Sequence, residues 1–327
     1  MHEGGRLGAG AATDCRAFRS IFQEDWWLQA VAGRDLDRVS VAENGRDVAH
    51  LYFVPRRVLG CRLLRMPPYT RTLGPVFENR GGADMPRTHR REICSRLVTA
   101  LPPHDYFEQV LEPADESGLV FALNGFAVGA SFTVRIPAGL AADDLWQRMD
   151  SRRRRRIRDR QKDLVVERHG DVARFVALAR REYSEAINYH RYDILAAAFE
   201  AAHGRGQAAV LSARRDDGSD ASSAVLLWDA QTMYFWLAAR DHDAGRGAKT
   251  LVLWEALNLA QSLGVAFDFD GFFSLSGANF ILSFGFPTQI RPVVTRARPM
   301  ARALLAGRAL AAGLAWRRRQ PSRLAPV

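Results

Sequence analysis

The chain has 327 residues, of which 47% are hydrophobic and 25% charged, the composition of an ordinary globular protein. That length exceeds what one hydrophobic core usually organises, so two domains or two fused lobes are expected. No apolar stretch of 18 residues is free of charge, which argues against a membrane-spanning helix. The positive charge behind the net charge of +10 comes almost wholly from arginine, since Lys162 and Lys249 are the only lysines. With this bias towards arginine, the net charge is weaker evidence for a nucleic-acid-binding function.

The first 17 residues contain no apolar core behind a basic start, so we expect a flexible leader rather than a secretory signal. The three cysteines, Cys15, Cys61 and Cys94, are far apart and lack the spacing of metal ligands. We therefore expect neither a disulfide framework nor a metal site, and a reducing cytoplasm fits this usage.

The first half, from residue 18 to about 140, alternates helical and strand-like patterns. Apolar residues at helical spacing predict helices over 18–27 and 89–101, and short β-branched runs predict strands over 38–43, 48–54, 61–66, 106–111 and 132–136. Between them, residues 67–75 hold three prolines and cannot continue a helix or a central strand. This loop is a candidate pocket wall in a mixed α/β lobe.

The second half, residues 141–298, repeats that order of elements. Asp143 and Asp144 predict the start of a helix that runs into 152–162. Further patterns predict helices over 171–186, 192–202 and 249–263 and strands over 208–213, 223–229, 233–239 and 266–270. Residues 299–327 predict a basic helical tail. The expected architecture is thus a mixed-sheet α/β fold with two tandem lobes.

A glycine-rich turn precedes the clearest predicted helix. It comprises Gly245, Arg246, Gly247, Ala248, Lys249 and Thr250. A turn of this kind exposes backbone N–H groups beside the positive end of the helix dipole, which suits a pyrophosphate. By itself the spacing also fits an ordinary loop.

The order of elements from 221 to 296 resembles the acyl-CoA site of the GNAT superfamily. Two strands, the glycine turn, a helix and another strand follow one another there. The sequence of several segments resembles the FemAB branch, which includes bridge-forming peptidoglycan transferases and BioF2-like acetyltransferases. The similar segments are MYFWLAA (233–239), VAFDFDG (265–271) and FILSFGF (280–286), with TLGP (72–75) and LVVE (164–167) upstream. The resemblance implies two GNAT-like lobes and acyl transfer to an amine, with the donor held by the second lobe.

One position departs from the branch. Members that use aminoacyl-tRNA commonly have Phe-Lys where this chain has Phe280-Ile281. The resemblance therefore favours acyl-CoA, in particular acetyl-CoA, as the donor and leaves an aminoacyl-tRNA-dependent peptidoglycan transferase as the alternative. A second alternative is a non-catalytic module that binds nucleic acid or anionic lipid.

Acyl transfer to an amine needs a proton acceptor and a group that stabilises the oxyanion. Asp268, Asp270 and Tyr234 lie on predicted strands next to the expected donor site. Asp268 and Asp270 share one strand face because side chains alternate with a period of two. All three are candidate catalytic residues, although an Asp before Gly is also a common turn acceptor.

Three segments are candidates for acceptor binding. In the arginine run 152–160, Arg153 and Arg156 share a helical face on which they could clamp a phosphorylated acceptor, whereas the rest of the run fits a solvated face. The other candidates are aromatic and polar loop residues, namely Tyr69, Arg71, Tyr189, His190 and Tyr192.

The tail carries leucines and Trp316 beside arginines, so it fits either an anionic membrane surface or packing on its own protein. The resemblance as a whole implies a cytoplasmic N-acyltransferase whose acceptor is an amine on a cell-envelope, glycan or peptidoglycan precursor. Peripheral contact with the inner membrane face through the tail is compatible with that function. For an enzyme, the only nucleic-acid partner considered is tRNA, as the alternative donor.

Overall fold

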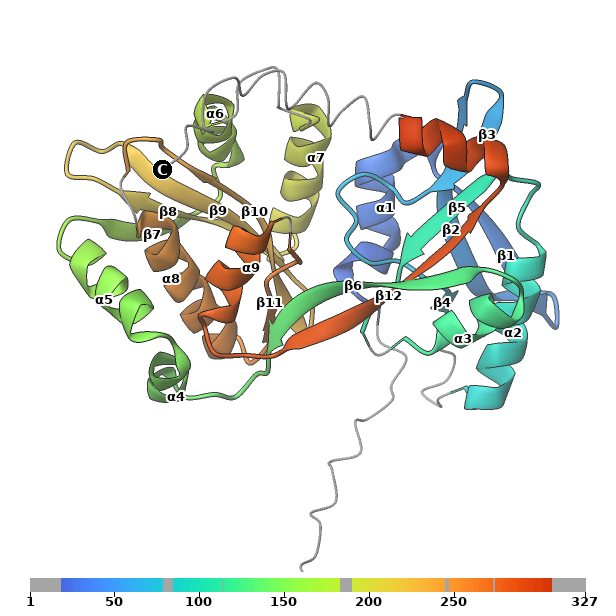
Figure 1. Ribbon diagram of the computed structural model, residues 1–327, viewed down its shortest axis with the longest axis horizontal. Coiled ribbons are helices and arrows are strands. Elements are labelled where there is room, and N and C mark those ends of the chain that lie inside the picture. Colours follow the sequence, from blue (N-terminus) through green and yellow to red (C-terminus); the bar gives the residue numbers. More distant parts are fainter. Residues whose placement is uncertain are drawn as a thin grey trace, which may run out of the picture.

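The computed structural model describes residues 19–78, 85–113, 115–182, 190–244, 247–272 and 274–307. These ranges form two α/β lobes that lie side by side (Figure 1). One 12-stranded mixed sheet runs through both lobes in the order β1-β2-β3-β5-β12-β6-β11-β10-β9-β8-β7, with β4 paired to β2. The expected mixed-sheet fold with two related lobes is confirmed.

The N-terminal lobe follows the predicted order, but the helix expected over 18–27 lies at 25–32 after a short 3-10 turn, and residues 76–77 and 117–123 form a strand and a helix that were not expected. Its elements are η1 (Ile21–Gln23), α1 (Asp25–Ala32), η2 (Gly33–Asp35), β1 (Asp37–Glu43), β2 (Arg46–Val58), β3 (Cys61–Arg65), β4 (Val76–Phe77), α2 (Arg87–Thr99), β5 (Tyr106–Val110) and α3 (Ser117–Leu123). Alternate residues of β2 separate two apolar layers. Leu51 and Phe53 pack with α2 and α3, whereas Tyr52 packs on the side of α1.

The C-terminal lobe places helices on both faces of its part of the sheet. Its elements are α4 (Ala142–Arg148), α5 (Ser151–Arg160), β7 (Val165–His169), α6 (Val172–Glu182), α7 (Tyr192–His203), β8 (Ala208–Arg214), β9 (Asp220–Trp228), β10 (Thr232–Arg240), α8 (Ala248–Ser262), β11 (Ala266–Asp268) and α9 (Leu275–Leu282). The residues of β9 are all buried, as expected for a strand covered on both faces. α8 packs on one face, and α6 and α7 pack on the other together with α1.

Two long strands join the lobes. β6 (Ala127–Ile136) and β12 (Thr288–Ala297) pair antiparallel with each other. The other edge of β6 pairs with β11, and the other edge of β12 pairs with β5 (Figure 1). The strand that precedes residue 140 therefore belongs partly to the second half of the sheet, and the last strand belongs partly to the first half.

Some elements differ from the expectations. The helix expected to run from Asp143 to residue 162 is two helices, because Asp150 is extended at ψ 140° and its N–H donates to the Ser283 carbonyl. The predicted strand 266–270 ends at Asp268, since Asp270 adopts a left-handed backbone at φ +66°. The patterns gave no hint of α9 or β12.

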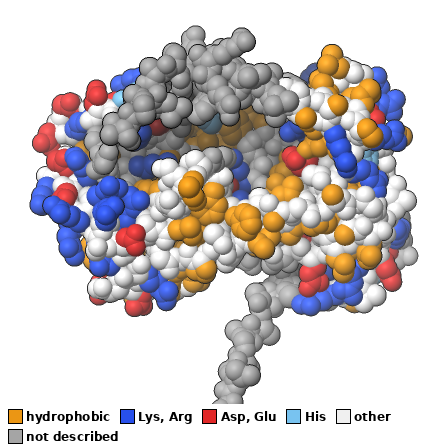
Figure 2. All heavy atoms as spheres, in the orientation of Figure 1, with side chains coloured by type: hydrophobic (Ala, Val, Ile, Leu, Met, Phe, Trp, Pro, Cys, Tyr) orange, Lys and Arg blue, Asp and Glu red, His pale blue; other side chains and the backbone are white. Residues whose placement is uncertain are grey.

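Residues 299–307 are helical and pack on the N-terminal lobe through Ala301, Leu304 and Leu305, which contact Cys61 and Leu63. The rest of the expected tail, from residue 308, and the expected leader lie outside the described residues. No helix within the described ranges is long and apolar enough to cross a membrane. Figure 2 shows basic side chains gathered at the edge of the molecule where α5 lies.

Candidate active site

The sheet opens in the C-terminal lobe where β10 and β11 separate. These parallel strands pair only through Thr232–Ala266, Met233–Phe267 and Tyr234–Asp268, and then β11 ends while β10 continues to Arg240. The register between β10 and β9 also skips Trp236, which forms a bulge. The second part of β10 therefore has a backbone edge without a parallel partner.

The glycine turn begins α8 beside this split. Gly247 is the N-cap residue of α8 at φ +123°, while Gly245 and Arg246 lie outside the described residues. Ala248 and Thr250 are buried in the lobe, so their side chains do not face a ligand. Lys249 is exposed, and its Nζ lies 6.0 Å from the centre of the Phe235 ring.

The arginine helix α5 lies directly against this turn. A Cβ atom on Gly247 would come within 3.0 Å of Arg160 Cγ and 3.5 Å of Arg156 Cβ. Arg153 donates through Nε to Ser283 Oγ at 2.6 Å and lies over the Phe280 ring. The structure thus places Arg156 beside the expected donor turn and Arg153 beside α9.

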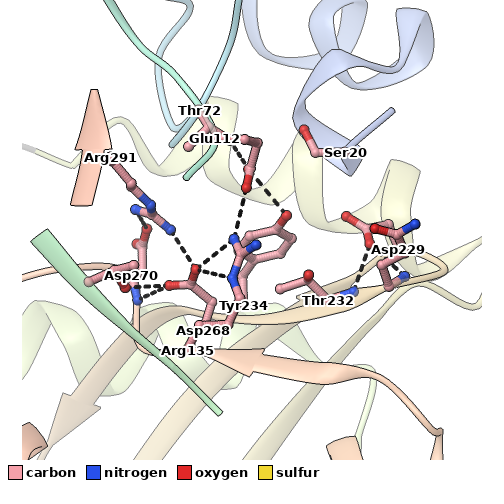
Figure 3. A network of polar contacts seen from close by, with 12 residues as sticks. Ser20, Thr72, Glu112, Arg135, Asp229, Thr232, Tyr234, Asp268, Asp270 and Arg291 are labelled. Atoms are coloured by element: carbon pink, nitrogen blue, oxygen red, sulfur yellow. Dashed lines mark hydrogen bonds and ion pairs between the residues drawn. The ribbon is translucent and has the colours of Figure 1, made fainter. Parts of the chain in front are cut away.

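Asp268 is the centre of a buried polar network between the lobes (Figure 3). Its carboxylate accepts from Thr133 Oγ1 at 2.6 Å and Arg135 Nε at 3.0 Å, and Arg291 Nη2 lies 2.9 Å away. Burial opposes ionisation, but Arg291 and Arg135 outweigh it and lower the pKa of Asp268 below its ordinary value. Asp268 therefore remains ionised and fully engaged, which suits an anchor more than a proton acceptor.

Asp270 is also buried, and it lies on the Arg71 side of the same network. Arg71 Nε is 2.5 Å from its Oδ2 atom, and Arg291 Nη1 donates to Oδ1 at 3.4 Å. Burial raises the pKa of Asp270 to about 6 in spite of these two arginines. A carboxylate with such a pKa can accept a proton and release it again near neutral pH.

Tyr234 has a different environment. Its ring is fully buried against Phe22, and its hydroxyl lies 3.5 Å from Glu112 Oε1. Burial raises its pKa well above the ordinary value. Glu112 also accepts hydrogen bonds from Thr72 Oγ1 and from Arg135 Nη2, the latter at 2.8 Å, which ties the first lobe to the network.

The predicted acceptor residues from the two lobes meet at the split. Tyr69, at φ +60°, lies parallel to His190 with ring centres 6.2 Å apart and edge-on to Trp236 at 5.5 Å. His190 in turn contacts Tyr192 at 5.9 Å, whereas Tyr189 lies outside the described residues. Arg71 extends from the same loop to Asp270 and to the Trp236 carbonyl.

Sequence reasoning missed Glu112, Arg135 and Arg291. Each is more than 20 residues from the others in the chain, so no local motif connects them. The available signal was weak: arginines within apolar strands are rarely buried unless they are paired with a carboxylate. Among the described residues, no group of three or more His, Cys, Asp or Glu side chains is arranged to hold a metal ion.

This geometry matches known proteins at the level of fold. Residues 147–275 match the family model described as an acetyltransferase (GNAT) domain. No curated protein sequence matches the chain.

Three solved structures are similar over most of their length. FemX has a TM-score of 0.65 at 12% identity, covering 87% of this chain and 94% of that one. The C-terminal domain of a putative lysylphosphatidylglycerol synthetase from Agrobacterium fabrum has a TM-score of 0.56 at 13% identity, covering 87% and 91%. L-PGS from Bacillus licheniformis has a TM-score of 0.55 at 10% identity, covering 85% and 90%. The chain therefore has a FemX-like fold, and its residues 147–275 match a GNAT acetyltransferase domain.

Proposed function

We propose that this protein is an N-acyltransferase that transfers an acyl group from acyl-CoA to an amine on a cell-envelope or polysaccharide precursor. The observation that carries the proposal is the position of Asp270, whose pKa is raised to about 6, beside the split between β10 and β11. Gly247, the N-cap residue of α8, lies next to Arg156, and together they can hold the donor's phosphates.

In the proposed reaction the amine nitrogen attacks the thioester carbonyl carbon. The new C–N bond forms, the C–S bond breaks, and the CoA sulfur leaves as a thiolate, which takes up a proton from solvent. Asp270 takes the proton that the amine must lose, and Arg291 stabilises the carboxylate before it accepts that proton. Asp268 holds Arg135 and Arg291 in place, and Tyr234 supports the network from the core.

The acceptor is proposed to lie along Tyr69, Arg71, His190 and Tyr192. These residues combine aromatic surface with one guanidinium group, which suits an amine on a larger polar or anionic molecule. One similar fold carries the name of a lysylphosphatidylglycerol synthetase, which favours an acceptor of the cell envelope. A place at the cytoplasmic side of the membrane, where acyl-CoA is made, follows from this proposal.

Aminoacyl-tRNA is the alternative donor, favoured by the exposed arginines of α5. Arg152 and Arg155 point into solvent, and Arg155 is 84% exposed. Against it, Ile281 packs with the apolar core beneath α8, so this position of α9 carries no positive charge. Acyl-CoA remains the preferred donor.

Thermal unfolding with and without ligand tests the proposal. Acetyl-CoA at about 100 times its Kd should stabilise the protein by about 2.7 kcal/mol, because it binds only the folded chain. Stabilisation by a charged tRNA but not by acetyl-CoA would favour the alternative donor. Stabilisation by neither donor, with binding to RNA or anionic vesicles, would favour the non-catalytic module.

A further inference from the structure

Arg71 connects two features that belong to different steps of the proposed reaction. Its Nη2 atom donates to the Trp236 carbonyl at 2.7 Å, and its Nε atom lies 2.5 Å from Asp270 Oδ2. Trp236 is the bulged residue of β10, on the strand that lines the split. One guanidinium group therefore holds both the strand edge and the proposed base.

The strand edge that Arg71 occupies is where an extended donor would have to pair. β10 has lost its parallel partner after Tyr234, so no strand of the sheet pairs with that edge beyond this residue, and Arg71 occupies the Trp236 carbonyl instead. The pantetheine arm of CoA is extended and carries two amides, which can pair with such an edge as an added strand would. An arm that pairs beside Trp236 needs the space that the guanidinium fills.

The loop that carries Arg71 is fixed, so its side chain can move without the backbone. Trp236 Nε1 donates to the Tyr69 carbonyl at 3.1 Å, and Trp27 Nε1 donates to Thr70 Oγ1 at 3.0 Å. Asp270 also keeps Arg291 as a second partner when Arg71 shifts. The side chain of Arg71 is 23% exposed, which leaves it a path towards the aromatic cluster.

We propose that Arg71 is a positioning residue that occupies the donor-binding edge of β10 in the free protein and is displaced from it when the donor binds. This inference rests on the proposed function. In the free protein Arg71 holds the Trp236 carbonyl; when the donor's arm takes the strand edge, the guanidinium turns to the side of Tyr69 and His190. There it meets the acceptor, so the acceptor class is an amine that carries a nearby carboxylate or phosphate.

Two consequences follow from this geometry. The donor binds before the acceptor, because only the donor frees the guanidinium for an anionic group. Free CoA also binds more weakly than its contacts would allow, since it must first displace an existing charged hydrogen bond. Removal of that hydrogen bond should therefore tighten CoA binding, the reverse of what the loss of an ordinary contact does.

Calorimetric titration with CoA of the wild type, Arg71→Lys, Arg71→Met and Arg174→Met tests the inference. Lysine keeps the charge but lacks the planar fork that presents Nε to Asp270 and Nη2 to the Trp236 carbonyl, so it should hold these two groups less firmly. We expect both Arg71 variants to bind CoA roughly threefold to tenfold tighter than the wild type.

Arg174 is the matched control, because it is also about one quarter exposed and pairs with a buried carboxylate, Asp220, outside the split. Arg174→Met should lose stability and keep the wild-type affinity for CoA. If the wild type binds CoA and both Arg71 variants bind it equally well or more weakly, the proposed role of Arg71 is wrong. The assignment of acyl-CoA as the donor would then still hold. An absence of CoA binding in all four proteins would overturn the donor assignment itself.

Discussion

The backbone N–H of Asp270 donates a hydrogen bond to Asp268 Oδ1 at 2.8 Å, yet the two carboxyl groups behave in opposite ways. Arg291 and Arg135 lower the pKa of Asp268 in spite of its burial, whereas burial raises that of Asp270 to about 6. Each carboxylate has two arginine partners, but Asp268 also accepts from Thr133 and from the Asp270 N–H, whereas the negative charge of Asp268 helps to raise the pKa of Asp270. This difference assigns separate roles to residues that the sequence treats alike.

Asparagine at each position should separate those roles. Asp270→Asn removes the proton acceptor, so turnover should fall by roughly 10²–10⁴-fold while stability changes by about 1 kcal/mol or less. Asp268→Asn leaves two buried guanidinium groups short of charge and should cost about 3–5 kcal/mol of unfolding free energy. Turnover and denaturant unfolding measured on both variants check this. Wild-type turnover in Asp270→Asn would remove it as the base.

The acid side of the pH–rate profile should report Asp270. Its carboxylate must be ionised to accept a proton, so kcat/KM should rise with pH through about 6 and then level off. Burial raises the pKa of Asp229 to about 6 as well, but Asp229 binds backbone N–H groups at the β9–β10 turn. The Asp229→Asn variant should therefore still show the rise of kcat/KM near pH 6. A profile that is flat from pH 5 to 8 would contradict the assignment.

Two glycines that flank α8 provide a matched test of the donor turn. Gly247→Ala places a Cβ against Arg160 and Arg156 at φ +123°, whereas Gly264→Ala, at φ +69°, has nothing within 4 Å. Both variants should lose about 1–2 kcal/mol of stability from backbone strain. Only Gly247→Ala should weaken CoA binding, as measured by calorimetry. Equal CoA affinity in the two variants would place the donor elsewhere.

Neighbouring arginines of α5 should differ in what they stabilise. Arg154 Nη1 donates to the carbonyls of Gln147 and Met149 at the end of α4, at 3.1 and 2.5 Å, whereas Arg152 is exposed. Arg154→Ala should lower the unfolding free energy by about 1–3 kcal/mol, and Arg152→Ala should change it by less than about 0.5 kcal/mol. Thermal melts of the two variants give the comparison. Equal losses would point to a diffuse effect of charge instead.

Local pattern alone determined much of the fold. The apolar spacing of α7 and α8 and the short apolar runs of β8, β9 and β10 predict these elements because each pattern depends only on near neighbours. The same holds for the glycine turn before α8 and for Asp268 and Asp270 on one segment. The proline-rich loop was also recognisable, since proline excludes regular structure there.

Only the tertiary structure decided how these parts form a site. Arg135 and Arg291 reach Asp268 because β6 and β12 cross between the lobes, and strand pairing over more than 130 residues leaves no mark in a local pattern. The different roles of Asp268 and Asp270 likewise depend on which charges surround each carboxylate after folding. Arg71 meets Trp236 for the same reason: the loop and the bulge lie 165 residues apart in the chain, and only packing of the two lobes brings them together.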